Sequence, residues 1–268
     1  MRDLTSIAEI RGAPRIWAVG AVHGEASRLK TLHDRLEPRL GARDALVYLG
    51  NYLGHGPDVV GTVEELLAFR RRVLAHPPLR VAADVIYLRG SQEEMWQKLL
   101  QLQFASDPRA ILAWVLSRGV EATLRAYGGD PDAGARAAAG GTILLNEWTR
   151  TLRDSVRRYP GHDAFFAGLK RAAVSNGEGR LLFVNCGIDT QRPLAAQSDA
   201  FWWAGRSFSE ITEPYEDYRR VVRGYDPDHN GFAETACTAT VDGGCGFGGP
   251  LTAACFDPAG AVVDRIDI

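Results

Sequence analysis

Residues 46–56 read LVYLGNYLGHG, four apolar residues followed by a seven-residue turn that contains three glycines. A short apolar run that ends at glycine is typical of a strand buried on both of its faces. The stretch therefore predicts a buried strand over Leu46–Leu49 and a glycine-rich turn over residues 50–56. The polar side chains of Asn51 and His55 then lie just beyond the carboxyl end of the strand.

The same pattern recurs four times along the chain. Apolar runs are followed by glycine-containing turns at Ile16–Val19, Val85–Leu88, Leu181–Val184 and Val221–Val222. Residues 25–40 and 59–74, between the first three runs, carry apolar residues at spacings of three and four, which predicts helices. Alternating strands and helices indicate an α/β fold with crossover helices. In such folds the turns at the carboxyl ends of the strands bind ligands.

The middle of the chain changes character. Residues from about 93 to 173 have the apolar spacing of helices, interrupted at 128–141 by GGDPDAGARAAAGG, which we interpret as an exposed loop. From residue 179 the chain returns to short strands and turns, and it ends in an alternating segment over 261–268. No repeat or linker divides the sequence. We expect a single domain over residues 1–268 with a helical insert at about 93–175.

The composition excludes several classes of protein. The 268 residues are 46% apolar and 24% charged with a net charge of −2, which excludes global disorder and nucleic-acid binding by bulk electrostatics. No apolar run reaches the ~18 residues of a transmembrane helix, and the first residues lack the apolar core of a secretory signal. The four cysteines lack the spacing of a zinc site and suit free buried thiols. We expect a cytoplasmic protein that binds neither membranes nor nucleic acids.

In their order along the chain, the five turns resemble those of the metallophosphoesterase superfamily, of the calcineurin-like type. The family's turns read G-D-x-H-G, G-D-x-x-D-R-G, G-N-H-E, H-A-G and G-H-T, and the segments here read G-A-V-H-G, G-N-Y-L-G-H-G, G-S-Q-E, N-C-G and G-Y-D. Residues 107–129 and 242–256 are similar to the family's middle helices and closing segment. The resemblance spans about 15–263 and is strongest to bacterial serine/threonine phosphoprotein phosphatases and symmetrical dinucleoside-tetraphosphatases. It implies two mixed β-sheets face to face, flanked by helices.

The resemblance also implies where the family holds two metal ions, and most of those positions have changed. They are Ala21, His23, Asn51, Ser91, Asn185 and Tyr225. Only His23 keeps its residue type, and Asn51 replaces the carboxylate that would bridge the two ions. The general-acid histidine is replaced by Gln92, the carboxylate that orients it by Gly54, and the phosphate-binding arginine by His55. We therefore expect no catalytic residue, no metal ion and no other cofactor.

Three side chains remain candidates for contact with a bound anion. They are His23, His55 and Arg206, the last of which aligns loosely with an arginine near the family's cleft. Structural roles are the alternatives for both histidines, as a packed turn residue and a solvated loop residue respectively. We expect Trp202 to lie in the core and Trp203 at the rim, with a role in an interface as the alternative.

Two further features suggest ligands only weakly. Asp226–Gly231 resembles the first half of a calcium-binding EF-hand loop, but the twelfth position is Cys237 where that loop requires glutamate. We interpret the segment as a polar surface turn. Cys186 follows a predicted strand near the site without a charged partner in the sequence, so we do not expect a reactive thiolate.

These observations favour a pseudophosphatase, a catalytically inactive phosphatase-like protein that binds a protein partner or a phosphorylated ligand. One alternative is a hydrolase that acts on phosphoesters or phosphoproteins with an altered or single-metal site. Another is an assembly subunit whose cleft is unused. Asn51, Ser91, Gln92, Asn185 and Tyr225 can each donate and accept hydrogen bonds, so we expect them to form a polar network where the family binds metal.

Overall fold

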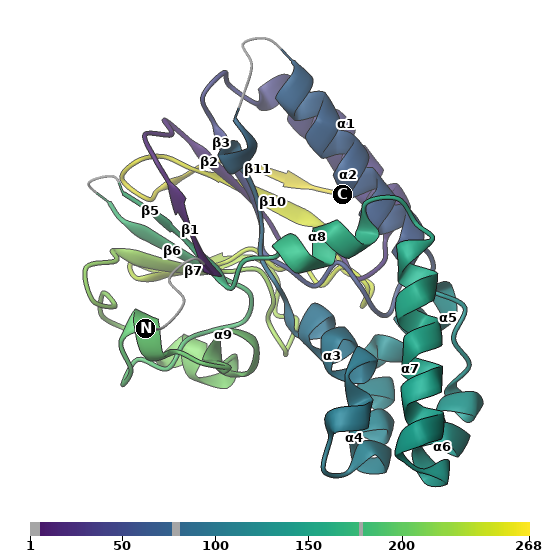
Figure 1. The fold of residues 1–268 in the computed structure, drawn as a ribbon. Coiled ribbons are helices and arrows are strands. Elements are labelled where there is room, and N and C mark those ends of the chain that lie inside the picture. Colours follow the sequence, from purple (N-terminus) through teal and green to yellow (C-terminus); the bar gives the residue numbers. More distant parts are fainter. Residues whose placement is uncertain (1–5, 77–80, 177–178) are drawn as a thin grey trace.

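The structure is a computed structural model that describes residues 6–76, 81–176 and 179–268. Within these residues two β-sheets pack face to face, with helices on their outer sides (Figure 1). One sheet has the strand order β11-β10-β2-β3-β4 and the other the order β1-β5-β6-β7-β9-β8. Both sheets are mixed: β2, β3 and β4 run parallel, whereas β10 is antiparallel to β2. The predicted α/β fold of two mixed sheets is confirmed.

Each of the five apolar runs of the sequence forms a strand, to within one residue at either end, and the alternating segment at 261–268 forms another; the described residues also contain strands that no run predicted. The bounds of the strands are β1 (Ile7–Ile10), β2 (Ile16–Val19), β3 (Ala45–Tyr48), β4 (Val85–Tyr87), β5 (Ala172–Ser175), β6 (Leu181–Val184), β7 (Arg220–Arg223), β8 (Ala233–Glu234), β9 (Thr238–Thr240), β10 (Thr252–Phe256) and β11 (Val262–Asp267). The runs at Ile16–Val19 and Leu181–Val184 match strands residue for residue, because all four side chains of each are buried. A strand covered on both faces is apolar along its whole length.

Alternate residues of one strand belong to different cores. In β2, Ile16 and Ala18 face the layer between the two sheets, whereas Trp17 and Val19 pack beneath the helices. Helices α1 (Ala26–Leu36) and α2 (Val59–Ala75) cover this outer face (Figure 1). The outer face of the other sheet is covered by α9 (Ala200–Trp203) and the loops that follow it.

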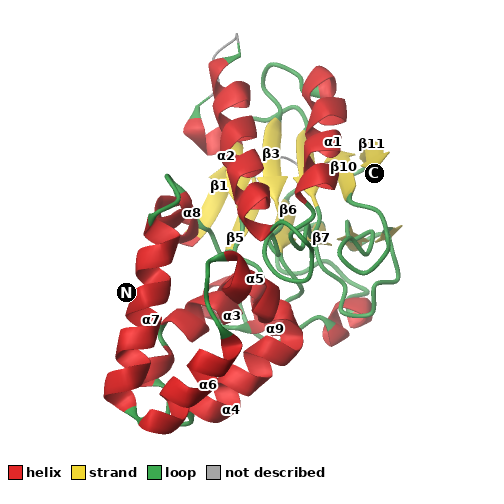
Figure 2. Ribbon diagram, turned by 90° about the vertical axis from the view of Figure 1, so that its right-hand side faces the viewer, coloured by secondary structure: helices red, strands yellow, loops and turns green. Residues whose placement is uncertain are grey.

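The helical segment lies to one side of the two sheets (Figure 2). Its helices are α3 (Ser91–Leu100), α4 (Pro108–Val115), α5 (Glu121–Ala126), α6 (Pro131–Gly140), α7 (Thr142–Arg157) and α8 (His162–Gly168). The segment ends before the expected boundary near residue 175, because Ala172–Ser175 form β5 and pair with β1 and β6.

The expectation of an exposed loop over residues 128–141 is wrong. Pro131–Gly140 form the helix α6, which begins at Asp130 with its carboxylate accepting hydrogen bonds from the N–H groups of Asp132 and Ala133. Proline at the first helical position and the alanines that follow favour a helix. Gly134 lies against the Trp148 ring of α7, where a side chain would collide with the indole. The glycine therefore permits close helix packing and does not break the helix.

None of the helices that the structure describes is long and apolar enough to cross a lipid bilayer.

Candidate functional site

The five predicted turns meet at one edge of the two sheets, beyond the carboxyl ends of β2, β3, β4, β6 and β7. Backbone hydrogen bonds join them directly. Ala21 N donates to Gly224 O at 2.8 Å, and His23 N donates to Asn51 O at 2.8 Å. Tyr225 N donates to Asn185 O at 2.9 Å. The structure thus brings together positions that are up to 204 residues apart in sequence, since 225 − 21 = 204.

A single buried carboxylate, Glu93 of α3, holds the turn after β3. Its two oxygens accept hydrogen bonds from the backbone N–H groups of Gly90, Asn51, Tyr52 and Leu53, at 2.8–3.1 Å. Burial raises the pKa of the Glu93 carboxyl, and these four N–H groups oppose the shift. The carboxylate therefore fixes the position of Asn51 relative to the start of α3.

The side chains of Asn51 and Ser91 are hydrogen-bonded to each other, and the side chain of Asn185 is hydrogen-bonded to the backbone of Ser91 and Leu49. Asn51 Oδ1 accepts from Ser91 Oγ and from Gln92 N, both at 3.1 Å. Asn185 Oδ1 accepts from Ser91 N at 3.0 Å, and its Nδ2 donates to Leu49 O at 2.8 Å. A polar network was expected among Asn51, Ser91, Gln92, Asn185 and Tyr225, and Asn51, Ser91 and Asn185 form it together with the Gln92 backbone. No hydrogen bond joins the Tyr225 hydroxyl to it within the described residues, and the Tyr225 ring instead contacts His23 and His229.

Gln92 and Gly54 form a second link on the side of the helical segment. Gln92 Nε2 donates to Arg118 O at 2.7 Å and lies 3.4 Å from His55 Nε2. Gly54 has a φ of +82°, and any side chain there would collide with Gln92 Oε1. The glutamine side chain therefore occupies the space that an acidic residue at Gly54 would need.

Three non-glycine residues of these turns have left-handed backbone conformations. They are His23, Asn51 and His55, with φ values of 52°, 58° and 53°. Residues with a Cβ atom adopt this region at a cost in free energy. The surrounding hydrogen bonds hold the three residues in place.

His23 lies at the centre of an aromatic cluster and is 1% exposed. Its ring centroid is 5.1 Å from that of His55, 5.5 Å from that of Tyr225 and 5.2 Å from that of Phe247. Burial, with a smaller effect of His55, lowers the pKa of His23 to about 3. The nearby Leu53 backbone acts to raise this pKa, although neither ring nitrogen of His23 forms a hydrogen bond within the described residues. His23 is therefore a neutral imidazole at physiological pH.

Phe247 covers this cluster from the solvent side, and the sequence analysis did not single it out. Its ring stacks on His229 with centroids 3.8 Å apart and tilts against His55 at 4.5 Å. It lies between Gly246 and Gly248, in the closing segment after β9. Tyr225 joins the same cluster by ring contacts with His23 and His229, and burial raises its pKa to about 12. The only local signal for Phe247 is a large aromatic residue among glycines.

Several buried polar atoms in this region have no hydrogen-bond partner among the described residues. They are both ring nitrogens of His23, Asn51 Nδ2, Gln92 Oε1 and His229 Nδ1. Buried polar atoms are usually paired, so a group of unpaired ones marks a place where a small polar species can bind.

The residues present do not fit the family's two-metal centre. The Asn51 oxygen already accepts two hydrogen bonds, Asn185 has no imidazole, and Ala21 offers only a methyl group. Over residues 6–76, 81–176 and 179–268, no cluster of three or more histidine, cysteine, aspartate or glutamate side chains is arranged to hold a metal ion.

Two carboxylates, Asp226 and Asp242, hold the turn over Asp226–Gly231 in place. The Asp226 carboxylate forms an ion pair with Arg223 at 3.1 Å and accepts from the N–H groups of Asp228 and Asn230. Asp242, which is 1% exposed, accepts from Asp226 N at 2.8 Å. These carboxylates hold the polypeptide chain in this turn.

A cleft of about 680 Å³ opens above the floor formed by these turns. Its lining includes the predicted positions His55, Ser91, Gln92, Tyr225 and Arg206. His23 and Asn51 lie beneath it, buried. The cleft is therefore where the resemblance implied a site.

The walls of the cleft include residues that the sequence analysis did not identify as site residues. Trp114 and Arg118 come from α4 and the turn of helix that follows it, and His229 comes from the turn after β7.

Trp202 is 5% exposed and Trp203 is 40% exposed, as expected for one residue in the core and one at the rim. Cys186 also lines the cleft, but burial raises its pKa to about 12, so it is a thiol at neutral pH.

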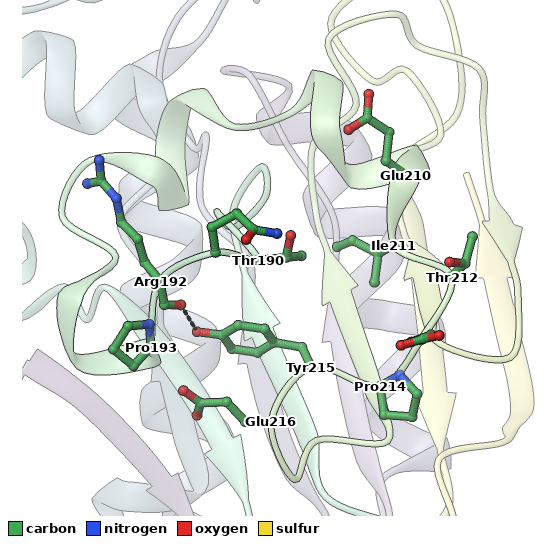
Figure 3. A pocket seen from close by; sticks show the side chains of 11 residues that line it. Thr190, Arg192, Pro193, Glu210, Ile211, Thr212, Pro214, Tyr215 and Glu216 are labelled. Atoms are coloured by element: carbon green, nitrogen blue, oxygen red, sulfur yellow. Dashed lines mark hydrogen bonds between the residues drawn. The ribbon is translucent and has the colours of Figure 1, made fainter.

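A second depression, of about 480 Å³, lies among surface loops (Figure 3). It is formed by the segments 190–193 and 210–216, and Tyr215 Oη donates to Arg192 O across it at 2.6 Å. None of the predicted site positions lines it.

No family model matches the chain, and no curated protein matches its sequence. Solved structures do match it. A candidate diadenosine tetraphosphatase is 18% identical, with a TM-score of 0.57 and 97% of each chain covered. A protein serine/threonine phosphatase from Saccharomyces cerevisiae is 11% identical, with a TM-score of 0.52, 98% of this chain and 82% of that chain covered. A cold-active protein-tyrosine phosphatase of a Shewanella species is 13% identical, with a TM-score of 0.53, 98% of this chain and 83% of that chain covered.

At these identities the matches speak for the fold and not for the chemistry. They cover nearly all of this chain, as does the resemblance of its turns. The chain therefore has the fold of the calcineurin-like metallophosphoesterases.

Proposed function

We propose that this protein is a pseudophosphatase, which keeps the phosphatase fold, does not hydrolyse phosphoesters with two metal ions, and acts by binding a ligand in its cleft. The observation that carries the proposal is the network around Asn51. Its amide oxygen stands where a bridging carboxylate is expected, and it accepts hydrogen bonds from Ser91 and Gln92. The floor of the site is thereby occupied by contacts that hold the fold.

The proton chemistry of the site supports the same proposal. Two-metal hydrolysis requires a metal-activated water, and general-acid catalysis requires a titratable proton near the leaving group. Gln92 has no such proton, and its Nε2 group donates to the Arg118 carbonyl. The Tyr225 hydroxyl, with a pKa of about 12, and the buried Cys186 thiol hold their protons tightly.

Binding is supported by the charge of the cleft. Arg118 and Arg206 are among its lining residues, and no aspartate or glutamate is found among the described residues that line it. The chain as a whole carries a net charge of −2, so the positive character is local. A cleft of this character favours an anionic ligand. Such a ligand is either a phosphorylated molecule or an acidic part of a protein partner.

A second candidate function is a hydrolase with an altered or single-metal site. It is favoured by a different observation, the ring nitrogens of buried His23, which have no hydrogen-bond partner among the described residues. A single ion could bind to the unprotonated ring nitrogen of His23, because the lowered pKa keeps the imidazole neutral.

Metal content and turnover distinguish the two functions. The full chain is incubated with manganese, iron or zinc, desalted and measured by plasma mass spectrometry, then assayed on para-nitrophenyl phosphate and diadenosine tetraphosphate. We expect metal near zero and no turnover above that of a His23→Ala variant. One or two ions per chain, with turnover that the variant lacks, would show that the protein is a hydrolase.

A further inference from the structure

The mouth of the cleft carries an aromatic corner. Trp114 of α4 and Trp203 of α9 meet with ring centroids 5.7 Å apart and planes 60° apart. The two residues are 39% and 40% exposed, and both line the cleft. A flat ligand ring can stack on one indole while its edge contacts the other.

An arginine follows each of these tryptophans. Arg118 comes four residues after Trp114, and Arg206 comes three residues after Trp203. Both arginines are exposed, both line the cleft, and neither forms an ion pair within the part of the chain that the structure describes.

We propose that this corner binds a small molecule in which a flat aromatic ring carries a single anionic group. The ring lies against Trp114 and Trp203, and the anion is held by Arg118 and Arg206. The inference rests on the proposed function, because it names the ligand class of the same cleft. Nucleoside monophosphates and aromatic carboxylates share this chemistry, and both fit a cleft of about 680 Å³.

The charges on the walls limit the ligand to one anionic group. The guanidiniums of Arg118 and Arg206 are the permanent positive charges among the described lining residues, and burial lowers the pKa of His55, which favours its neutral form. No metal-binding cluster was found among the described residues to neutralise a chain of phosphates. We therefore expect a second or third phosphate to add no affinity.

The binding test uses isothermal titration calorimetry on the full chain, with metal content measured on the same sample. The probes are adenosine monophosphate, indole-3-acetate, adenosine, ribose 5-phosphate and adenosine triphosphate. Adenosine monophosphate or indole-3-acetate is expected to bind at least about tenfold more tightly than adenosine or ribose 5-phosphate, because each of those lacks one half of the recognised group. The preferred probe shows which of the two sources supplies the ligand.

Two variants connect binding to the corner. Trp203→Leu and Arg206→Gln are each expected to weaken binding of the preferred probe by about tenfold or more. Phe104→Leu and Arg150→Gln are the matched controls. They remove an exposed aromatic ring and an arginine from a different surface depression, and are expected to leave the affinity unchanged. Circular dichroism melting confirms that each variant is folded.

Failure of this inference is distinct from failure of the proposed function. Three results would each overturn the proposed binding at the aromatic corner, whatever the metal content. No probe binds, ribose 5-phosphate binds as tightly as adenosine monophosphate, or adenosine triphosphate binds much more tightly than adenosine monophosphate. A metal-loaded and active protein would overturn the pseudophosphatase. If Trp203→Leu then raised KM and left kcat unchanged, the corner would still be a ring-binding site.

Discussion

The floor and the mouth of the cleft differ in almost every physical respect. Asn51, Ser91 and Asn185 in the floor are buried and joined by hydrogen bonds between the turns. Arg118 and Arg206 at the mouth are exposed and unpaired within the described residues. Side chains at the floor thus stabilise the fold, whereas we propose that those at the mouth bind the ligand. Substitutions should therefore separate the two regions by their effect on stability.

The largest effect is expected at Glu93. Glu93→Gln leaves one carbonyl oxygen to serve four backbone N–H groups and places an NH₂ group against N–H donors. We expect a loss of about 3–5 kcal/mol in the free energy of unfolding, measured by urea denaturation. Glu94→Gln is the matched control: within the described residues the partly buried Glu94 carboxylate pairs with the more exposed Arg89 and Lys98, and the variant should lose less than about 1 kcal/mol. Equal losses would show that the floor is not held by this carboxylate.

Phe247 tests whether the floor is sealed from the mouth. Phe247→Ala removes a ring that contacts His23, His55 and His229. We expect a loss of about 2 kcal/mol in stability, below the range for a fully buried phenylalanine because Phe247 is 43% exposed. Water then reaches His23, so its pKa, followed by the imidazole proton signals in NMR, should rise from about 3 towards its ordinary value. An unchanged His23 pKa would mean that another element excludes water.

His23 makes the stability of the floor depend on pH. Its pKa in the folded chain is about 3, against 6.5 for the ordinary group, so the unfolded chain binds a proton that the folded chain does not. The stability is present in full above pH 6.5 and is lost as the pH falls towards 3, by about 1.4 kcal/mol per pH unit. His162, with a pKa lowered to about 4, adds to the same fall. His23→Asn should reduce the slope of the unfolding free energy against pH by about 1.4 kcal/mol per pH unit, the contribution of one proton. Equal slopes for the variant and the unchanged protein would show that His23 is not the group that takes up this proton.

The smallest effect is expected at the mouth. Arg118→Gln and Arg206→Gln remove exposed charges without an ion-pair partner in the described chain, so each should change the free energy of unfolding by less than about 0.5 kcal/mol. Thermal unfolding followed by circular dichroism is sufficient to measure this. A loss comparable to that of a floor variant would show that these arginines hold the fold and are not free for a ligand.

The sequence was sufficient to predict the strands that lead into the five turns, but not all strands of the two sheets: β5, for example, lies inside the expected helical insert. Strands β2 and β6 match apolar runs residue for residue, because both faces of each strand are covered and no polar residue interrupts the signal. The convergence of Ala21, Asn51 and Asn185 followed from the order of the turns, since carboxyl ends of neighbouring strands meet at one edge. The helix α6 was not predicted, because the glycines in residues 128–141 were interpreted as signs of a loop. Asp130-Pro131, which is typical of a helix start, and the alanines that follow were given less weight.

The walls of the cleft could not be predicted in the same way. Trp114 and Trp203 are 89 residues apart, since 203 − 114 = 89, and Phe247 comes from the closing segment of the chain. Their contacts depend on how the helical segment and α9 pack against the sheets, and no local pattern encodes that packing. The unusual shielding of His23 follows from the same packing and shifts its pKa further than its neighbours in sequence suggest.

The left-handed conformations of His23, Asn51 and His55 bear on protein engineering. Each conformation costs on the order of 1–3 kcal/mol relative to ordinary backbone, and the fold maintains all three although the residues on these turns do not fit a two-metal centre. The backbone conformation of these turns therefore does not depend on a full set of metal-ligating side chains. A designer who grafts new ligating groups onto these turns needs to change side chains and not the path of the main chain.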